Sequence, residues 1–212
     1  MTLYFRTVAT AARRAGAIVS VKVPKRASAP SVKLDGGKLQ ITGLKSGQTE
    51  YRVGDATTWT TFVPASSSVK GMDLAALLSA AGTPANFPLP AGLIEFRTKA
   101  TDKKAASAVR VLEIPAQPSA PTAVSLVGTA LSVQDNTPKR TYEYTRVEKN
   151  GTLNIQTAKW SSLTASRAVI IPKASVGDRI YVRIKSATDS ATKLTVPASA
   201  CLELPITSIT IK

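Results

Sequence analysis

Apolar and polar side chains alternate along several short stretches of the chain. From Ile94 to Ala100 every second position is apolar or small, and charged side chains occupy the positions between them. The stretch from Ile180 to Lys185 alternates in the same way. A period of two residues places successive side chains on opposite faces of a β-strand. Both stretches therefore predict strands with one buried face and one charged face.

The alternating stretch belongs to an internal repeat. Residues 3–10 match residues 94–101, and the match continues without a gap as far as Pro24 and Pro115. A third copy begins at residues 180–189. The first two copies are 91 residues apart. A period of this length predicts tandem domains, because solenoids are built from much shorter repeats.

Proline-rich stretches divide the chain at residues 24–30 and 115–121. Proline cannot donate a hydrogen bond to a β-ladder, and it stiffens a connector. We therefore predict three parts in an extended row. The arm, residues 1–29, holds the terminal strands of an incomplete repeat; the first unit, residues 30–120, and the second unit, residues 121–212, are each a complete β-sandwich repeat.

Further strand and turn signals fill both units. In the second unit, Asn150-Gly151 lies between alternating runs and predicts a tight hairpin. One helix is expected in an insertion of the first unit, where Asp73 can cap residues 74–81 and Gly82 can end the helix. The predicted fold class is all-β, with tandem β-sandwich domains and this one short helix.

The residue types present exclude much of enzyme chemistry. Histidine is absent, and Cys201 is the single cysteine. A Ser-His-Asp or Cys-His pair, a disulfide within the chain and a cysteine zinc cluster are therefore impossible. The 13 acidic residues form no pattern that selects two of them as a catalytic pair. We expect a protein that is not an enzyme and that holds no cofactor and no metal ion.

The chain is strongly basic, with 28 Lys and Arg residues against 13 Asp and Glu residues and a formal net charge of +15. Positive charge distributed along the chain attracts polyanions, but it does not identify which polyanion binds. A solubilising charge on a strand face is the simpler explanation for the arginine that recurs in all three copies of the repeat. The candidate polyanion contacts are Arg6, Arg13, Arg14, Arg97 and Arg183.

Two classes of partner are not favoured. No apolar run reaches the roughly 18 residues of a membrane-spanning helix, so membrane insertion is not expected. Nucleic-acid binding would need basic residues interleaved with exposed aromatic residues, and aromatic residues make up only 5% of the chain. Trp59 and Trp160 occupy related positions in the two units. Core packing is the default interpretation for both, and a sugar-stacking platform is the alternative.

Three segments of the chain resemble a known group of proteins. The segments are residues 37–44, residues 50–59, and residues 96–102 together with Ser107-Ala108 and Ile114-Pro115. They resemble the tandem Ig-like or fibronectin-type-III-like repeats of Firmicute cell-surface proteins, including S-layer proteins. The resemblance covers nearly all of the first unit and is weaker in the second. It implies a secreted, non-catalytic protein on the bacterial cell surface that forms fibres or lattices.

The arm matches only the end of a repeat, with strands expected at about residues 3–10 and 16–23. A lone two-stranded hairpin is marginal in water, so its apolar face needs a cover. There are two explanations: a fragment of a longer protein or a processed chain, which the sequence alone favours, or an arm that donates strands to a neighbouring copy of the same protein. The candidate assembly strands carry Leu3, Phe5, Thr7, Ile18, Val21 and Val23.

The predicted function is a structural building block of a bacterial surface layer or surface fibre, with other copies of the same chain as partners and strand complementation from the arm as one route of assembly. The alternative is an adhesion module whose basic faces hold anionic cell-wall polymer or another polyanion. Steep weakening of binding with salt would mark the alternative, because released counterions produce that dependence.

Overall fold

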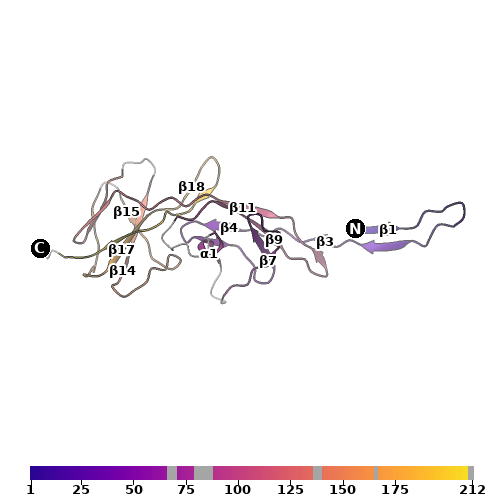
Figure 1. Ribbon diagram of the computed structural model, residues 1–212, viewed down its shortest axis with the longest axis horizontal. Helices are drawn as coiled ribbons and strands as arrows, with labels where there is room; N and C mark the ends of the chain where they lie inside the picture. Colours follow the sequence, from indigo (N-terminus) through magenta and orange to yellow (C-terminus); the bar gives the residue numbers. More distant parts are fainter. Residues whose placement is uncertain (66–70, 79–87, 136–139, 165–166, 210–212) are drawn as a thin grey trace.

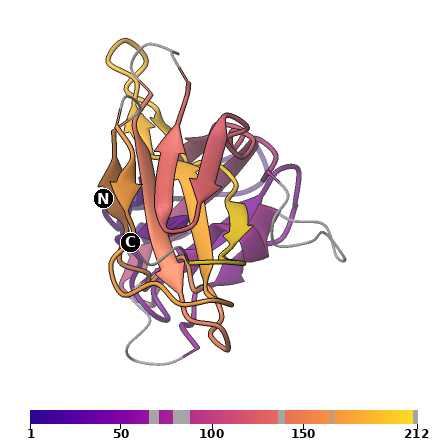
Figure 2. The same ribbon diagram turned by 90° about the vertical axis from the view of Figure 1, so that its left-hand side faces the viewer.

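The computed structural model describes residues 1–65, 71–78, 88–135, 140–164 and 167–209. The three parts of the chain follow one another along a row: the arm extends at one end, the first unit lies in the middle, and the second unit lies at the other end (Figure 1). Figure 2 looks along this row and shows the strands of the second unit in front of the first.

The first unit consists of two antiparallel sheets. The smaller sheet has three strands in the order β4-β5-β8, and the larger has four in the order β11-β9-β6-β7. The strands of the smaller sheet are β4 (Lys33–Asp35), β5 (Gln40–Thr42) and β8 (Met72–Asp73). Those of the larger sheet are β6 (Thr49–Val53), β7 (Thr60–Thr61), β9 (Gly92–Thr98) and β11 (Arg110–Ile114).

The second unit repeats this arrangement. Its three-stranded sheet has the order β12-β13-β16, and its four-stranded sheet has the order β15-β14-β17-β20. The smaller sheet contains β12 (Val124–Val127), β13 (Ala130–Val133) and β16 (Val169–Ile170). The larger contains β14 (Tyr142–Val147), β15 (Ser161–Leu163), β17 (Arg179–Ile184) and β20 (Leu202–Pro205). Three strands facing four is the division found in Ig-like and fibronectin-type-III-like sandwiches, and the predicted all-β fold class is confirmed.

Each unit has its own core, and the two-residue alternation explains which side chains form it. In β9, Ile94 and Phe96 are fully buried in the core of the first unit. In β17, Ile180 and Val182 are fully buried in the core of the second. The intervening side chains point to the outer face of the same sheets.

The one described helix, α1 (Leu74–Leu78), follows β8 directly, as the sequence predicts. The Asp73 carboxylate accepts a hydrogen bond from the Ala75 N–H at 2.9 Å, so Asp73 caps the helix. Leu74 is fully buried and joins the helix to the core of the first unit. The expected end of the helix at Gly82 lies outside the described residues.

The hairpin predicted at Asn150-Gly151 is wrong. Strand β14 pairs with β15, and Tyr142 lies opposite Leu163, so the connection between the two strands is long. Ile155 lies in this connection and packs against the core of the first unit. A turn does form, since the Gly151 N–H donates to the Glu148 carbonyl at 2.8 Å, but no strand pairs back after it because the partly buried Ile155 packs against the other unit instead.

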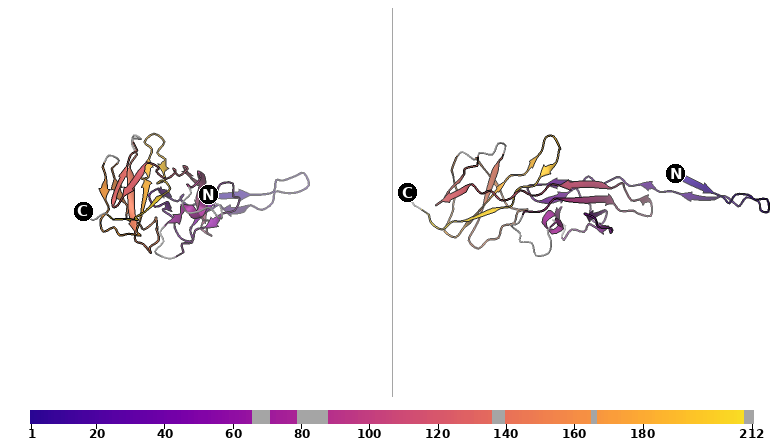
Figure 3. Two further views of the ribbon diagram at one scale, coloured as in Figure 1. Left: turned by 60° about the vertical axis from the view of Figure 1, so that its left-hand side comes forward. Right: turned by 45° about the horizontal axis from the view of Figure 1, so that its top comes forward.

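The arm is a two-stranded antiparallel hairpin formed by β1 (Thr2–Phe5) and β2 (Val19–Lys22). It extends from the first unit along the axis of the row (Figures 1 and 3). Every residue of both strands is exposed.

Short strands and loops tie the parts together at the two proline-rich stretches. Between the arm and the first unit, β3 (Lys25–Arg26) pairs in parallel with β10 (Lys104–Ala105), which lies near the tip of the β9–β11 hairpin. The second unit extends its corresponding β17–β20 hairpin by the pair β18 (Ala187–Thr188) and β19 (Thr195–Val196). In both cases a hairpin of the later part reaches back towards the part before it.

Candidate functional site

The arm reproduces the last hairpin of a complete unit in its backbone pairing. Leu3 lies opposite Val21 in the arm, and Ile94 lies opposite Leu112 in the first unit. Each pair of the arm corresponds to a pair 91 residues later, so the register of β1 and β2 is that of β9 and β11. The repeat seen in the sequence is therefore also a repeat of hydrogen-bonded structure.

The connecting loop of the arm is folded like its counterpart. The Thr10 N–H donates to the Arg13 carbonyl at 2.9 Å, and the Thr101 N–H donates to the Lys104 carbonyl at 2.8 Å. The Gly16 N–H donates to the Thr7 carbonyl at 3.2 Å, as the Ser107 N–H does to Thr98 at 3.1 Å. Thr7 also accepts a bond from the Gly16 N–H at its hydroxyl, at 3.0 Å. These bonds hold the hairpin in its register without any contribution from a core.

The apolar face of the arm is uncovered. Leu3 and Phe5 are 38% and 55% exposed, whereas their counterparts Ile94 and Phe96 are both fully buried. Val21 is 47% exposed, and its counterpart Leu112 packs against the core of the first unit. The arm thus presents the inner face of a sandwich to solvent, and water contact with this apolar area is unfavourable.

The predicted assembly residues fall into two groups. Leu3, Phe5, Val21 and Val23 correspond to side chains that lie in or against the core of the first unit. Thr7 serves the turn of the hairpin instead. Ile18 precedes β2 and corresponds to Val109, which is 44% exposed even in the complete first unit. Ile18 is therefore not part of the apolar face that a sandwich would cover.

On the outer face of the first unit, Arg97 is held by two neighbours. Its Nε donates to Glu50 at 2.7 Å, and these two residues lie directly opposite each other on β9 and β6. The guanidinium lies over the ring of Trp59, 4.2 Å from its centroid. Arg52 lies over the same ring at 4.8 Å and pairs with Glu95. Trp59 is therefore a platform for two ion-paired arginines rather than a core side chain.

The second unit repeats this arrangement in a more buried form. Arg183 lies opposite Glu143 and donates to it from Nε at 2.7 Å. Its guanidinium lies over Trp160, 3.6 Å from the ring centroid. The Arg183 side chain is only 2% exposed. The predictions of Arg183 as a polyanion contact and of Trp160 as a core side chain are corrected, because the two stack on each other on the outer face of the sheet.

The arginine of the arm at the same position is Arg6, which is exposed, as are Arg13 and Arg14 in the connecting loop of the arm. Arg97 is partly exposed, but its Nε donates to Glu50 and its guanidinium lies over Trp59. The structure thus separates the five predicted polyanion contacts: three lie free on the arm surface, and the two on complete units are engaged within their own sheets.

A basic groove that the sequence did not reveal lies where the arm meets the first unit. It has a volume of about 860 Å³. Its walls come from the linker after the arm, the loop between β5 and β6 that contains Gly43 and Gly47, and the tip of the β9–β11 hairpin. Four lysines and no acidic residue line it: Lys45, Lys99, Lys103 and Lys104. Lys99, Lys103 and Lys104 come from the tip of one hairpin, and folding brings the distant Lys45 to the same groove.

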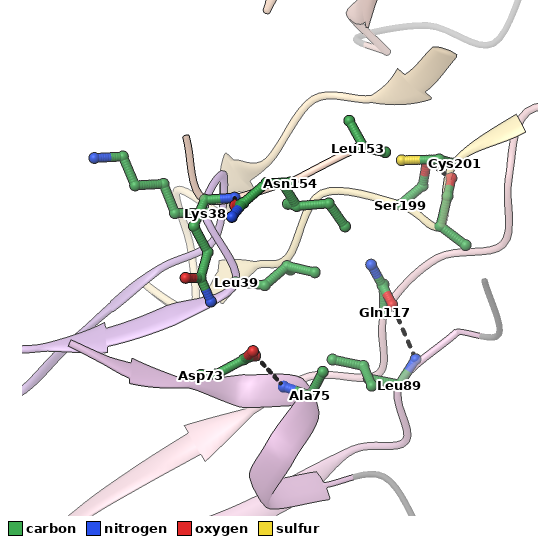
Figure 4. A pocket seen from close by; sticks show the side chains of 13 residues that line it. Lys38, Leu39, Asp73, Ala75, Leu89, Gln117, Leu153, Asn154, Ser199 and Cys201 are labelled. Atoms are coloured by element: carbon green, nitrogen blue, oxygen red, sulfur yellow. Dashed lines mark hydrogen bonds between the residues drawn. The ribbon is translucent and has the colours of Figure 1, made fainter. Parts of the chain in front are cut away.

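A smaller cavity of about 300 Å³ lies between the two units (Figure 4). Gln117 is buried in its wall and bridges the units: its Nε2 donates to the Ala198 carbonyl at 2.8 Å, and its Oε1 accepts from the Leu89 N–H at 3.0 Å. Cys201 lines the same cavity. Burial raises the pKa of the Cys201 thiol to about 11, so the group is protonated at neutral pH and is a poor nucleophile.

Other kinds of site are not seen in the described part of the chain. No three His, Cys, Asp or Glu side chains among those residues come together in a way that could hold a metal ion. None of the described helices has the length and apolar character needed to cross a membrane.

Comparisons with known proteins add little to this geometry. No family model matches the chain, and no curated protein matches it. Among solved structures, the FN1–FN3 domains of chicken CNTN1 are similar to the chain at 15% sequence identity and a TM-score of 0.31. The similarity covers 98% of this chain and 78% of that one. The fold class therefore rests on the sheets described above.

Proposed function

We propose that the protein is an extracellular structural module of a bacterial cell surface, a stiff row of β-sandwich units whose arm joins the row to the next member of a surface layer or fibre. The observation that carries this proposal is the way each part docks on the one before it. Backbone hydrogen bonds hold both proline-rich connections, and the buried Gln117 side chain adds to the second, whereas free connections would act as hinges between the units.

The junction between the two units supports a fixed orientation. The Ala198 N–H donates to the Gly36 carbonyl and the Ala200 N–H to the Pro118 carbonyl, both at 2.9 Å. Gln117 adds its side-chain bonds to both units from a buried position. Buried and bonded linkers transmit orientation, whereas solvated linkers let the units move independently. The motifs of the first unit and their resemblance to surface-layer repeats support the cellular setting.

The stiffness of the row is tested by small-angle X-ray scattering of the full chain. We expect the wild-type protein to fit one extended shape. Gln117→Ala should require a broader distribution of orientations, because it removes the side-chain bond to Ala198 across the junction and the bond to Leu89 that holds the Gln117 side chain in place. Gln134→Ala is the matched control, since Gln134 is exposed. A wild-type protein that already samples many orientations, or a Gln117→Ala protein that scatters like the control, would refute the proposal.

The basic groove favours a second candidate function, the binding of an anionic wall polymer. Four lysines around one open groove create a positive potential that a flexible polyanion could follow. Polyglutamate and heparin are suitable probes of this chemistry. The double variant Lys103→Gln and Lys104→Gln should bind more weakly and with a smaller salt dependence than the wild type. Arg13→Gln and Arg14→Gln change the same amount of charge outside the groove, and equal losses in both variants would count against the groove.

A further inference from the structure

We propose that the arm completes a β-sandwich whose other strands come from a separate segment of the same repeat type, and that Arg6 recognises that segment through a glutamate and a tryptophan. The inference rests on the proposed function, because it assigns the partner through which one module joins the next. The partner is thus defined by chemistry: an open sandwich that offers a Glu at the position of Glu50 and a Trp at the position of Trp59.

The arm is the same hairpin as the last one of the first unit. The register of the arm and the bonds of its loop are those of β9 and β11. In the first unit, β9 lies between β11 and β6, and its inner face is covered by the smaller sheet. In the arm, β1 is the counterpart of β9, and it pairs with β2 alone. To form a complete sandwich, the arm therefore lacks a counterpart of β6 paired with the free edge of β1 and a small sheet that covers Leu3 and Phe5.

Arg6 has counterparts in both complete units. Its counterparts Arg97 and Arg183 both donate to a glutamate directly opposite on the neighbouring strand, and both stack on a tryptophan. In each unit that tryptophan precedes the edge-strand residue opposite the glutamate by two positions. Two units with different cores keep the same three residue types. A segment that pairs with β1 in this register would place its own glutamate and tryptophan against Arg6.

A second copy of this chain does not offer such a site within its described residues. Glu50 and Trp59 are engaged by Arg97, and Glu143 and Trp160 are engaged by Arg183. Both four-stranded sheets already contain their own final hairpin. For the arm to enter either sheet, that hairpin would have to leave. The chemistry therefore points to a sandwich that lacks its last two strands.

The test extends the full chain by a second copy of residues 27–91 placed directly before Met1. Met1 corresponds to Gly92, so the inserted copy meets the arm as residue 91 meets β9. The inserted copy supplies the Glu and the Trp named above. Hydrogen exchange is measured for the peptide covering residues 2–7, and the β9 peptide of the same molecule serves as the internal reference.

We expect the arm peptide to exchange fast in the unextended chain and to slow to the rate of the β9 peptide in the extended chain. Arg6→Ala should speed exchange of the arm in the extended chain only, and Arg6→Lys should restore protection in part, because lysine lacks the planar fork of arginine. Trp59→Ala and Glu50→Gln made together in the inserted copy should abolish the effect of Arg6→Ala on exchange of the arm. Arg13→Ala, in the exposed loop of the arm, should have no effect.

An arm that stays unprotected in the extended chain would overturn the inference. Full protection that Arg6→Ala leaves unchanged would overturn the role of Arg6. Association of the unextended chain with itself in sedimentation velocity, lost in Phe5→Asp and kept in Tyr4→Asp, would identify a second copy as the partner and also overturn it. None of these results alters the scattering test of the stiff row, so failure of the inference and failure of the proposed function are separate outcomes.

Discussion

Arg183 lies directly opposite Glu143 on the neighbouring strand, and its Nε donates to the Glu143 carboxylate at 2.7 Å while the guanidinium stacks on Trp160. The same three residue types meet in the first unit, where Arg97 is 29% exposed and Arg183 only 2%. The same Arg–Glu–Trp cluster is therefore partly exposed in the first unit and buried in the second, and its contribution to stability should differ between the two units.

Arg183→Ala should destabilise the second unit by about 3–5 kcal/mol, because it leaves the buried Glu143 carboxylate without its counter-charge. Arg97→Ala should cost the first unit only about 1 kcal/mol, since solvent screens the more exposed pair. Hydrogen exchange of β17 and β9 peptides during denaturant titration reports on the units separately. Equal losses in the two variants would show that burial is not what sets the strength of the pair.

Acid should weaken the second unit through Asp178. Burial of this carboxyl pushes its pKa up, but hydrogen bonds from the Ser175 N–H, Arg146 and the Lys149 N–H, together with the charge of Arg146, hold the pKa below its ordinary value of 3.8. The unfolded chain therefore binds the proton first as pH falls. The stabilisation from Asp178 is complete above about pH 4 and is lost as pH drops through the folded-state pKa.

The measurement is the unfolding midpoint of the second unit between pH 6 and pH 2. Asp178→Asn should lower stability at pH 6 by roughly 2 kcal/mol, because the amide cannot replace the charged hydrogen bonds. The variant should also show a shallower decline in acid than the wild type. A decline of the same steepness in both proteins would assign the acid sensitivity to other carboxyl groups.

Alkylation of Cys201 should be slow in the native protein. Burial raises the pKa of its thiol to about 11, and Glu143 adds to this rise, whereas the charge of Arg183 lowers the pKa. About 100-fold less thiolate is present at pH 8 than in the unfolded chain, whose thiol has its ordinary pKa. Native iodoacetamide rates should therefore continue to rise with pH beyond pH 10. A native rate that levels off near pH 9 would contradict the burial of this thiol.

The same shift has a consequence for stability. Because the folded-state pKa lies above the unfolded value, the neutral thiol stabilises the fold fully below about pH 9, and this contribution is lost as pH rises towards 11. Cys201→Ser removes the titration, since a serine hydroxyl stays neutral throughout this range. The variant should therefore lose less stability than the wild type between pH 9 and pH 11, as measured by urea unfolding.

Gly43 should tolerate alanine much less well than Gly47. Both glycines have positive φ, 82° and 68° respectively. A Cβ at Gly43 would overlap the Ser31 carbonyl, whereas a Cβ at Gly47 would meet open space. Gly47→Ala should cost about 1–2 kcal/mol from backbone strain alone. Gly43→Ala should cost roughly 2 kcal/mol more, because the backbone of the linker must shift. Equal shifts of the melting temperature in the two variants would show that the contact of Gly43 with the Ser31 carbonyl does not affect stability.

Strands such as β9 and β17 follow from local alternation, which is why they could be predicted. The sequence match of residues 3–10 and 94–101 also anticipated a hairpin in the arm, and the bonds of the two hairpins agree pair by pair. The hairpin predicted at Asn150-Gly151 failed because a turn signal describes a few residues, whereas the partly buried Ile155 after the turn packs against another unit. Its position depends on contacts that are distant in sequence.

By itself, the sequence determined which side chains share a face of each strand, because that depends only on the two-residue period of the backbone. It could not determine whether a face is covered, because covering side chains arrive from other strands. Tertiary structure alone placed Trp160 over Arg183, brought Lys45 to the lysines of the β9–β11 hairpin tip and left the inner face of the arm open. The role of each arginine was thus decided by its neighbours in space, since burial and charge pairing are properties of the assembled sheets.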